Sequence, residues 1–418
     1  MEHRGVLSRQ KVREGLARRR RRQTQRVVLG AILLVVLTSL VTYSVFGQGA
    51  PGLASGGDPR ISKLWTIIRL VQEQYVDGPV DVNKLLEGAY EGVVRALGDP
   101  HSNYLSKEAY EEWMIDIGGR YAGVGMTIID RDGVVEVVRP FPGTPAHKAG
   151  LRPGDRIIKV DDREVVGLTA DDVANMVRGQ AGTRVKLTVE RDTNGSVQVL
   201  EFDLVRANIQ VPAVEAAGVL PGGIGYIQLT SFNENAYDQT AAALDSLQKQ
   251  GMRALILDLR HNGGGALEQA VKIAGLLVPR GLVVSVVGRD GREEEYRTEG
   301  PGLGKPLVLL VDGYTASASE IVAGAVRDYG TGKLVGTKTF GKGSVQHLFP
   351  LPDGSGVRVT VAKYYTPSGA SIHKVGLVPD VEVALPQGEM PLAPLEGNKV
   401  DAQVAKALEV VKGLLGER

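Results

Sequence analysis

The sequence predicts an α/β, multidomain fold. Its parts are an N-terminal transmembrane helix, a small helical region, a strand-rich module, an α/β core with a βαβ-type sheet and a C-terminal helix. Three observations support this prediction. Residues 27–46 are uncharged and almost entirely apolar. Short strand-like runs between Gly/Pro turns fill residues 116–206. Apolar strands alternate with helical segments over residues 207–384, a pattern typical of parallel strands joined by helices.

Composition excludes several classes of protein. The chain of 418 residues is long enough for two or three domains, and its 43% hydrophobic and 23% charged residues indicate a globular protein, not a disordered one. Its 54 glycines are nearly double the usual share of about 7%, which indicates many tight turns. Cysteine is absent, which excludes disulfides, thiolate nucleophiles, zinc fingers and iron–sulfur clusters.

The net charge of +1 is the sum of two unequal parts. Residues 1–26 form a basic arm of charge +8, and the residues from 47 onward carry −7. The apolar segment 27–46 matches the roughly 20 residues of a membrane span and exceeds the apolar core of about 7–15 residues of a signal peptide. We therefore expect an uncleaved single-pass anchor in the cell membrane, although small residues around Ala54 leave cleavage open. The positive-inside rule places the arm in the cytoplasm and the rest outside it, so no nucleic-acid partner is needed to explain the arm.

The segments after the anchor follow in a clear order. Residues 47–60 are a Gly/Pro/Ser-rich linker, and helical spacing over 61–76 and 82–98, with a third helix near Ser106, predicts a helical N-terminal region over 61–115. The strand-rich module spans 116–206 and the α/β core 207–384. Residues 385–418 contain a Pro-rich linker and a last helix over 400–414. Apolar faces on 61–98 and 400–415 are predicted to pair between two subunits, so we expect a homodimer.

The core is predicted from its alternation of elements. Strands are expected at 225–229, 254–260, 282–288, 306–312 and 357–365, and helices at about 234–250, 266–278 and 318–329. Buried apolar strands joined by helices favour parallel pairing.

The strand-rich module carries a candidate binding site. Glycines 123 and 125 stand directly before a strand in YAGVGMT, where backbone N–H groups can turn toward a carboxylate and the strand edge can accept an extended peptide. The following PGTPAHKAGLRPGDRIIKVDDREV (142–165) resembles the PDZ domain family, in the circularly ordered form attached to bacterial proteases. The resemblance implies a ligand with a free C-terminus. The residues implied to bind it are Gly123, Val124, Gly125, Met126, Val173 and Val177, although Val173 is equally explained as plain core.

Two core segments contain groups suited to nucleophilic catalysis. In VDGYTASASEIVAGAVRDYG (311–330) a serine lies at a turn between strand and helix, where free N–H groups favour negative charge; an ordinary N-cap serine is the alternative. In GTKTFGKGSVQ (336–346), Lys342 between two glycines can act as a general base if burial lowers its pKa, and Gln346 can orient the amine. A solvated surface lysine is the alternative.

A third segment, LDLRHNGGGALEQA (257–270), offers backbone N–H groups for an anion. Phosphate binding is the rival use, but the Walker lysine is missing. The six histidines have no metal-ligand spacing, so neither a metal nor an organic cofactor is implied.

Together these segments resemble the carboxyl-terminal processing proteases, also called tail-specific proteases. The matching motifs are DLRHNGGG (258–265), TASASEI (315–321), KTFGKGSVQ (338–346), YYTPSGASI (364–372) and VGLVPDVEV (375–383). The resemblance implies a serine endopeptidase that cleaves proteins or peptides near their C-termini. It also implies Ser317 as nucleophile, Lys342 as general base, Gln346 as its orienting partner, and an oxyanion hole from the N–H groups of Ala318 and Gly264.

Departures and alternatives remain. The family usually has Pro at the position of Gly263 and Ser at that of Thr315, which puts the geometry of the glycine loop in doubt but not Ser317. Ser319 is the nearest rival nucleophile, and His261 or His347 are rival bases. A different function is a catalytically silent, membrane-tethered PDZ adaptor. Domain order also suggests that the PDZ domain gates the enzyme.

Overall fold

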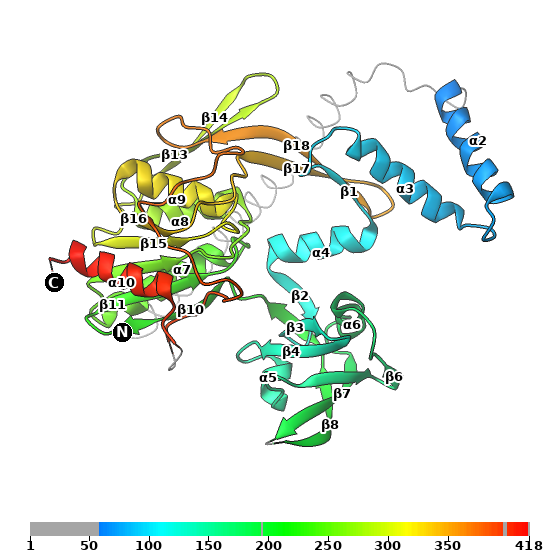
Figure 1. Ribbon diagram of the computed structural model, residues 1–418, viewed down its shortest axis with the longest axis horizontal. Helices are drawn as coiled ribbons and strands as arrows, with labels where there is room; N and C mark the ends of the chain where they lie inside the picture. The colour runs from blue at the N-terminus through cyan, green and yellow to red at the C-terminus, as the bar shows by residue number, and fades with distance from the viewer. Residues whose placement is uncertain (1–57, 194, 396–398, 417–418) are drawn as a thin grey trace, which may run out of the picture. The chain divides into compact units, whose positions relative to one another are not determined.

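The computed structural model describes residues 58–193, 195–395 and 399–416 (Figure 1). The chain divides into two units, 1–88 and 89–418. In the first, α2 (Pro59–Gln74) begins where Asp58 accepts a hydrogen bond from the amide of Arg60 and Pro59 supplies a pre-set backbone angle. The helix α3 (Val82–Arg95) begins in this unit, and α4 (Lys107–Gly118) belongs to the second.

The fold-class prediction is wrong in including a transmembrane helix. Within the described ranges, no helix is long and apolar enough to cross a membrane. Even the 16-residue α2 spans only about 24 Å, against a bilayer core of about 30 Å, and it carries Arg60, Lys63 and Arg69. Residues 27–46, on which the anchor was expected, lie outside the described residues. The extracytoplasmic location stays a prediction.

The α/β core is built on a six-stranded sheet in the order β10-β11-β12-β15-β16-β19. Its strands are β10 (Val214–Leu220), β11 (Ile224–Leu229), β12 (Ala254–Asp258), β15 (Leu307–Val311), β16 (Lys333–Gly336) and β19 (Val381–Glu382). The pairs from β11 to β19 are parallel, as expected, and β10 is antiparallel to β11. The carboxyl ends of β12 and β15 therefore meet at one edge of the sheet.

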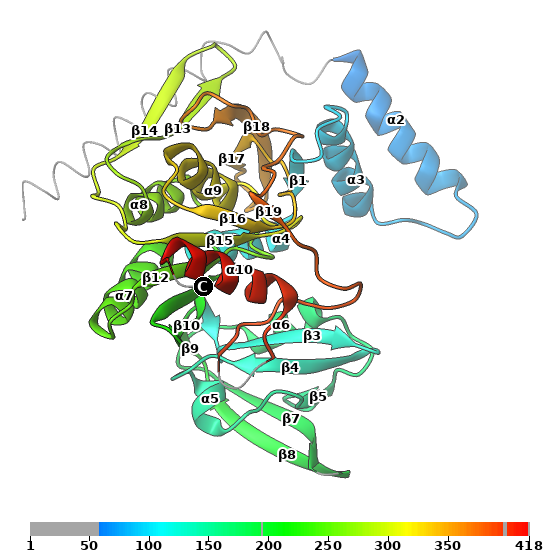
Figure 2. The same ribbon diagram turned by 60° about the vertical axis from the view of Figure 1, so that its left-hand side comes forward.

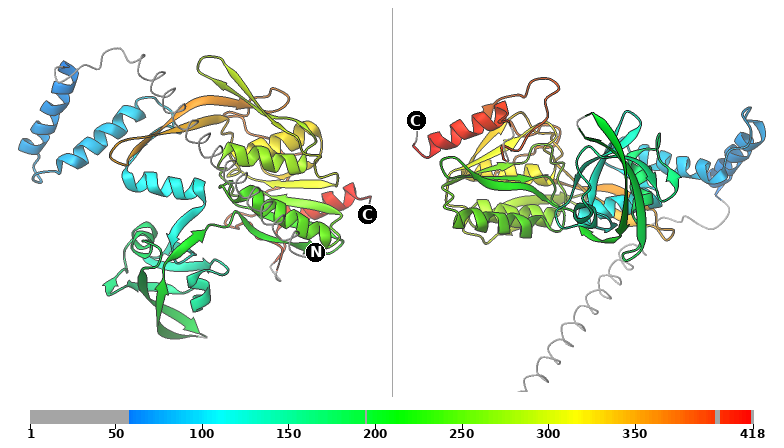
Figure 3. Two further views of the ribbon diagram at one scale, coloured as in Figure 1. Left: turned by 180° about the vertical axis from the view of Figure 1, so that it is seen from behind. Right: turned by 90° about the horizontal axis from the view of Figure 1, so that it is seen from below.

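Helices cover both faces of this sheet (Figure 3, right). On one face, α7 (Ala236–Lys249), α8 (Leu267–Leu277) and α9 (Ala318–Tyr329) bury side chains such as Leu247, Ile273 and Val322. On the other face, α10 (Ala402–Leu414) buries Val404 and Val411 against alternate residues of the same strands. The expected helices thus form close to their predicted bounds. Because Val404 and Val411 are buried within the chain, this face of α10 is not free to pair between subunits, and the homodimer stays a prediction.

A second sheet has the order β1-β18-β13-β14, with β17 also paired to β18. Its strands are β1 (Asn103–Leu105), β13 (Gly281–Gly288), β14 (Glu293–Thr298), β17 (Ser344–Pro350) and β18 (Gly356–Tyr365). All of its pairs are antiparallel. The runs 282–288 and 357–365 were expected in a parallel core sheet and lie here instead. An apolar run indicates a strand, but it does not specify which other strand it pairs with.

The strand-rich module, with β3, β4, β5, β7 and β8 labelled in Figure 2, has a hydrophobic core of its own. Its sheet contains β3 (Met126–Arg131), β4 (Val134–Pro140), β5 (Arg156–Val160), β6 (Arg163–Glu164), β7 (Arg184–Thr193) and β8 (Ser196–Val205). Two helices, α5 (Pro145–Ala149) and α6 (Ala170–Val177), accompany it, and α6 starts at a capping box between Thr169 and Asp172. A separate ribbon of β2 (Arg120–Gly123) and β9 (Ala207–Gln210) joins the two ends of the module.

Candidate active site

Ser317 lies in the turn between β15 and α9, with backbone angles φ 58° and ψ −117°. This conformation is strained for an L-residue. Such strain persists only where the surrounding structure holds it, and it is found most often at functional sites. The N–H of Ser317 donates to Glu320 Oε2 at 3.0 Å, and its carbonyl accepts from the Tyr364 hydroxyl at 3.1 Å. The backbone of Ser317 is therefore held at both its N–H and its carbonyl.

Glu320 is completely buried and is the centre of this arrangement. Its Oε2 also accepts the N–H of Lys342 at 2.9 Å, and its Oε1 accepts the N–H of Gly341 at 2.8 Å and the Thr339 hydroxyl at 2.6 Å. Burial raises the pKa of Glu320, although these four donors act against it. One buried carboxylate thereby joins the first turn of α9 to the loop that carries Lys342.

Lys342 is half-buried beside this loop, and the single hydrogen of the Tyr364 hydroxyl is shared between the Lys342 carbonyl and that of Ser317. Burial lowers the pKa of the Lys342 amine, and the charge of Arg358 lowers it further. The charges of Asp99 and Glu320 oppose this shift but do not cancel it. A lowered pKa is what a lysine needs to serve as a general base near neutral pH.

Gln346 lies on β17, opposite Thr360 of β18. Its Nε2 donates to the Ser344 hydroxyl at 2.9 Å and to the Thr360 hydroxyl at 3.2 Å. In the part of the chain that the structure describes, no hydrogen bond joins Gln346 to Lys342. The predicted partner is thus held by two hydroxyls, with its amide oxygen still available to accept.

The glycine loop lies directly against the nucleophile turn. Gly264 has φ +103°, and a Cβ added to it would lie 2.8 Å from Cβ of Ser317 and 2.9 Å from the nitrogen of Ala318. This places the two predicted oxyanion residues, Ala318 and Gly264, side by side. The N–H of Gly264, however, donates to Asn262 Oδ1 at 2.9 Å, so an oxyanion would have to replace that acceptor.

Ser319, the rival nucleophile, has a structural role. It is fully buried, and its hydroxyl donates to the carbonyl of Asn262 at 2.9 Å. The same carbonyl accepts the N–H of Ala316 at 3.0 Å. These bonds fasten the glycine loop to α9, and they leave Ser319 without access to a substrate.

The Asp-Leu-Arg part of the glycine motif forms a buried ion cluster that sequence reasoning did not foresee. Arg260 is bonded to Asp258 at 2.6 Å and to Asp401, the N-cap of α10, at 2.8 Å. Burial alone would lower the pKa of Arg260, but the two carboxylates outweigh it and raise the pKa. This cluster ties α10 to the strand end from which the glycine loop emerges.

The two rival bases, His261 and His347, contact other side chains. Nδ1 of His261 lies 2.6 Å from Asp312, and its ring packs on Tyr314 with centroids 4.5 Å apart. His347 is exposed and lies edge-on to Phe349. Among the described residues, neither histidine is hydrogen-bonded to Ser317.

The predicted peptide-binding residues divide into two groups. Val124, Val173 and Val177 are buried in the core of the module, which is the alternative that the sequence left open for Val173. Gly123, Gly125 (φ +82°) and Met126 form the loop at the start of β3, and the ring of Tyr121 lies against Gly123. Burial raises the pKa of the Tyr121 hydroxyl.

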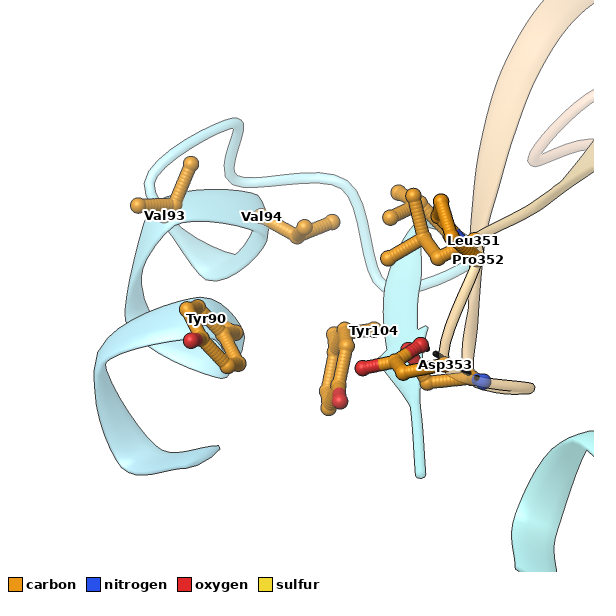
Figure 4. A pocket seen from close by; sticks show the side chains of 9 residues that line it. Tyr90, Val93, Val94, Tyr104, Leu351, Pro352 and Asp353 are labelled. Atoms are coloured by element: carbon orange, nitrogen blue, oxygen red, sulfur yellow. Dashed lines mark hydrogen bonds between the residues drawn. The ribbon is translucent and has the colours of Figure 1, made fainter. Parts of the chain in front are cut away.

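A separate apolar cavity of about 420 Å³ lies between α3, β1 and the β17–β18 turn (Figure 4). Tyr90 and Val93 of α3 line one side of it and Tyr104, Leu351 and Asp353 the other, and none of the candidate reacting residues lines it. Over the described ranges, no group of three or more His, Asp or Glu side chains is arranged to hold a metal ion.

Comparisons with known proteins identify the family of the chain. A profile of Peptidase family S41 matches residues 223–383, a PDZ domain profile matches 136–191, and a profile of the activating protease CtpB N-terminal domain matches 49–109. The carboxy-terminal processing protease CtpA of Bacillus subtilis is 36% identical over 86% of this chain and 76% of its own length. The chain belongs to the S41 family of carboxy-terminal processing proteases.

Other relatives support the same family and the same fold. The carboxyl-terminal-processing protease of a Synechocystis species is 38% identical over 82% of this chain and 81% of its own length. The solved structure of a putative S41 protease from Bacteroides fragilis, at 20% identity, covers 87% of this chain and 99% of its own with a TM-score of 0.53, and shows the same fold. The predicted family and the predicted enzyme class, a serine protease that processes C-termini, are confirmed.

One residue of the S41 site was missed although the sequence carried a signal for it. Ser317 and Glu320 have the spacing of a capping box, S-x-x-E, in which the glutamate returns to the N-cap backbone. That pattern predicts the bond to Ser317. It does not predict the other three donors, because they come from a loop about twenty residues later in the chain.

Proposed function

We propose that this S41 protease hydrolyses peptide bonds with Ser317 as nucleophile and Lys342 as general base. The observation that carries the proposal is that the backbones of both residues are bonded to one oxygen of Glu320. This holds the two side chains on facing segments at the N-terminus of α9. The lowered pKa of Lys342 and the strained turn at Ser317 support the same roles.

The reaction has two halves. The neutral amine of Lys342 takes the proton of the Ser317 hydroxyl as its oxygen attacks the peptide carbonyl, and the ammonium returns that proton to the leaving amine. Water then attacks the acyl-enzyme and gives a proton to Lys342, and Lys342 passes that proton to the Ser317 oxygen as the new C-terminus leaves. The negative oxygen of each intermediate is stabilised by the N–H of Ala318 at the start of α9 and by the N–H of Gly264 once it leaves Asn262.

We also propose that the PDZ domain binds the C-terminal tail of the substrate. The loop of Gly123, Gly125 and Met126 lies at the start of a strand, where backbone N–H groups can receive a carboxylate. A substrate with a free C-terminal carboxylate should therefore be cleaved at least about tenfold more efficiently than the same peptide with an amidated end, since a charge-assisted hydrogen bond contributes about 1.5–3 kcal/mol.

The central test is cleavage of a fluorogenic peptide that ends in an apolar, uncharged tail. Ser317→Ala and Lys342→Ala should each abolish turnover while circular dichroism shows a folded protein. Lys338→Ala, an exposed lysine of the same loop, is the matched control and should keep wild-type activity. Near-normal cleavage by Lys342→Ala would reject the Ser–Lys assignment. Loss of activity on replacing His261 by Ala, with Lys342→Ala active, would favour the histidine as base.

A further inference from the structure

Thr339 lies in the loop between β16 and β17, outside the residues assigned to the reaction. Its side chain is buried, and its hydroxyl donates to Glu320 Oε1 at 2.6 Å. Hydrogen bonds from a hydroxyl to an ionised oxygen have lengths of about 2.5–2.7 Å, shorter than those between neutral groups. The contact therefore indicates a charge-assisted hydrogen bond to the carboxylate that holds the backbones of Ser317 and Lys342.

A later segment of the chain sets the direction of this hydrogen bond. The N–H of Leu377 donates to the Thr339 hydroxyl oxygen at 2.7 Å. Because an amide N–H can only donate, the hydroxyl accepts this bond and keeps its own single hydrogen for Glu320. The N–H of Thr339 in turn donates to the carbonyl of Leu377 at 3.0 Å. This pair of hydrogen bonds fixes the residue, and it directs the hydroxyl hydrogen to the carboxylate.

The segment 372–377, to which Leu377 belongs, is itself well anchored. Ile372 and Leu377 at its two ends are buried in the main hydrophobic core. Between them, the N–H of Lys374 donates to the carbonyl of Gly341 at 2.7 Å, so the segment also contacts the loop on the far side of Thr339. The support for the hydroxyl thus comes from the core and not from a mobile surface group.

Thr339 differs from the other donors to Glu320. Those three are the backbone N–H groups of Ser317, Gly341 and Lys342, which can neither reverse nor accept a hydrogen. Burial raises the pKa of Glu320, and among its hydrogen bonds that of the Thr339 hydroxyl opposes this shift most. Without the hydroxyl, the carboxyl takes up a proton more readily, and that proton then faces N–H groups that cannot accept it.

We propose that Thr339 is a positioning residue of this protease: its hydroxyl, directed by Leu377, holds the Glu320 carboxylate in the orientation that aligns Ser317 with Lys342. The inference rests on the proposed Ser317–Lys342 mechanism and deepens it. Thr339 touches no reacting atom and acts through Glu320.

The test uses the full-length enzyme and the fluorogenic tail peptide. Thr339→Val removes the hydroxyl at nearly equal size. We expect kcat to fall by about tenfold to a hundredfold with KM within about twofold, because the reacting pair is misaligned while the substrate-binding surface is unchanged. Labelling of Ser317 by a fluorophosphonate, which reports the reactivity of the serine without a peptide, should slow by a similar factor.

Thr337→Val is the matched control, since it makes the same change two residues earlier in the loop. The backbone N–H of Thr337 donates to the Val311 carbonyl at 3.0 Å, and its hydroxyl makes no hydrogen bond within the ranges that the structure describes. Its kcat should stay within about twofold of wild type.

Thr339→Ser and Thr339→Ala keep the test decisive if valine is poorly tolerated at this buried position. These two variants differ only in the hydroxyl, and circular dichroism shows whether each is folded. Thr339→Ser should retain at least about a third of the wild-type kcat, whereas Thr339→Ala should lose as much as Thr339→Val. Wild-type kcat in a folded Thr339→Val, or equal losses in the serine and alanine variants, would overturn the inference.

A double-mutant cycle shows whether Thr339 acts through Glu320. In a Glu320→Gln enzyme, adding Thr339→Val should lower kcat by less than about threefold, because the carboxylate on which the hydroxyl acts is already gone. A loss as large as in the wild-type background would show that Thr339 acts independently and would also overturn the inference. Activity that survives in Ser317→Ala or Lys342→Ala would instead reject the underlying mechanism, so the two failures are distinct.

Discussion

The backbone amides of Ser317 and Lys342 donate to the same oxygen, Oε2 of Glu320, at 3.0 and 2.9 Å. Two residues 25 positions apart in the chain are thus held by one buried carboxylate. Both bonds are made by main-chain N–H groups, so neither side chain is used to hold its own residue in place. The arrangement leaves the hydroxyl and the amine free for chemistry.

Replacing Glu320 with Gln should damage both stability and activity. The amide keeps one acceptor oxygen but places an NH₂ group against two of the four donors, and a buried donor without an acceptor costs about 1–3 kcal/mol. We expect a lower midpoint in urea and a kcat reduced at least about tenfold. Glu409→Gln on the exposed side of α10 should change stability by less than about 0.5 kcal/mol. A wild-type kcat in Glu320→Gln would show that the carboxylate does not position Ser317.

Replacing Lys342 with Met should abolish cleavage yet stabilise the protein near neutral pH. The folded-state pKa of Lys342 is depressed, so the unfolded chain binds more protons between that value and 10.5, and stability rises with pH across this window. Methionine removes the cost of burying the charge and with it this part of the pH dependence. Urea unfolding at several pH values measures both effects. An unchanged slope of stability with pH would contradict a depressed pKa.

Arg358 provides an independent check on the pKa of Lys342. Its positive charge lowers the pKa of the amine, so Arg358→Met should raise it and move the acid limb of kcat/KM to higher pH, with activity recovering in alkaline buffer. Lys363→Met on the same strand is the control, because Lys363 is not among the charges that shift Lys342. A shift toward lower pH would mean that the titrating group is not Lys342.

The local parts of this fold were predictable and the non-local ones were not. The turn and helix at 312–329 follow from small residues before an apolar periodic run, and α9 begins at the predicted Ala318. The antiparallel pairing of 282–288 with 357–365 has no local signal, since apolar runs do not specify partners. The hydrogen bond between Ser102 and Thr360 is the extreme case: it joins residues 258 positions apart, and only the folded chain brings them together.

Two adjacent glycines, Gly263 and Gly264, differ in how closely they approach the turn that carries Ser317. Gly264 has φ +103°, and a Cβ there would come within 2.8 Å of the Ala316 carbonyl and of Ser317 Cβ. Neither can move away, because the turn is bonded to Glu320, Tyr364 and Asn262. Gly264→Ala should therefore abolish cleavage and lower the melting temperature.

Gly263 is the matched control, since a Cβ at this position meets nothing within 4 Å. Gly263→Ala should keep activity within about twofold and leave stability within about 0.5 kcal/mol of wild type. Equal loss of activity in both variants would show that the loop needs flexibility and not close approach. A folded and active Gly264→Ala would remove the loop from the oxyanion site, because its backbone could not then lie against Ser317 and Ala318.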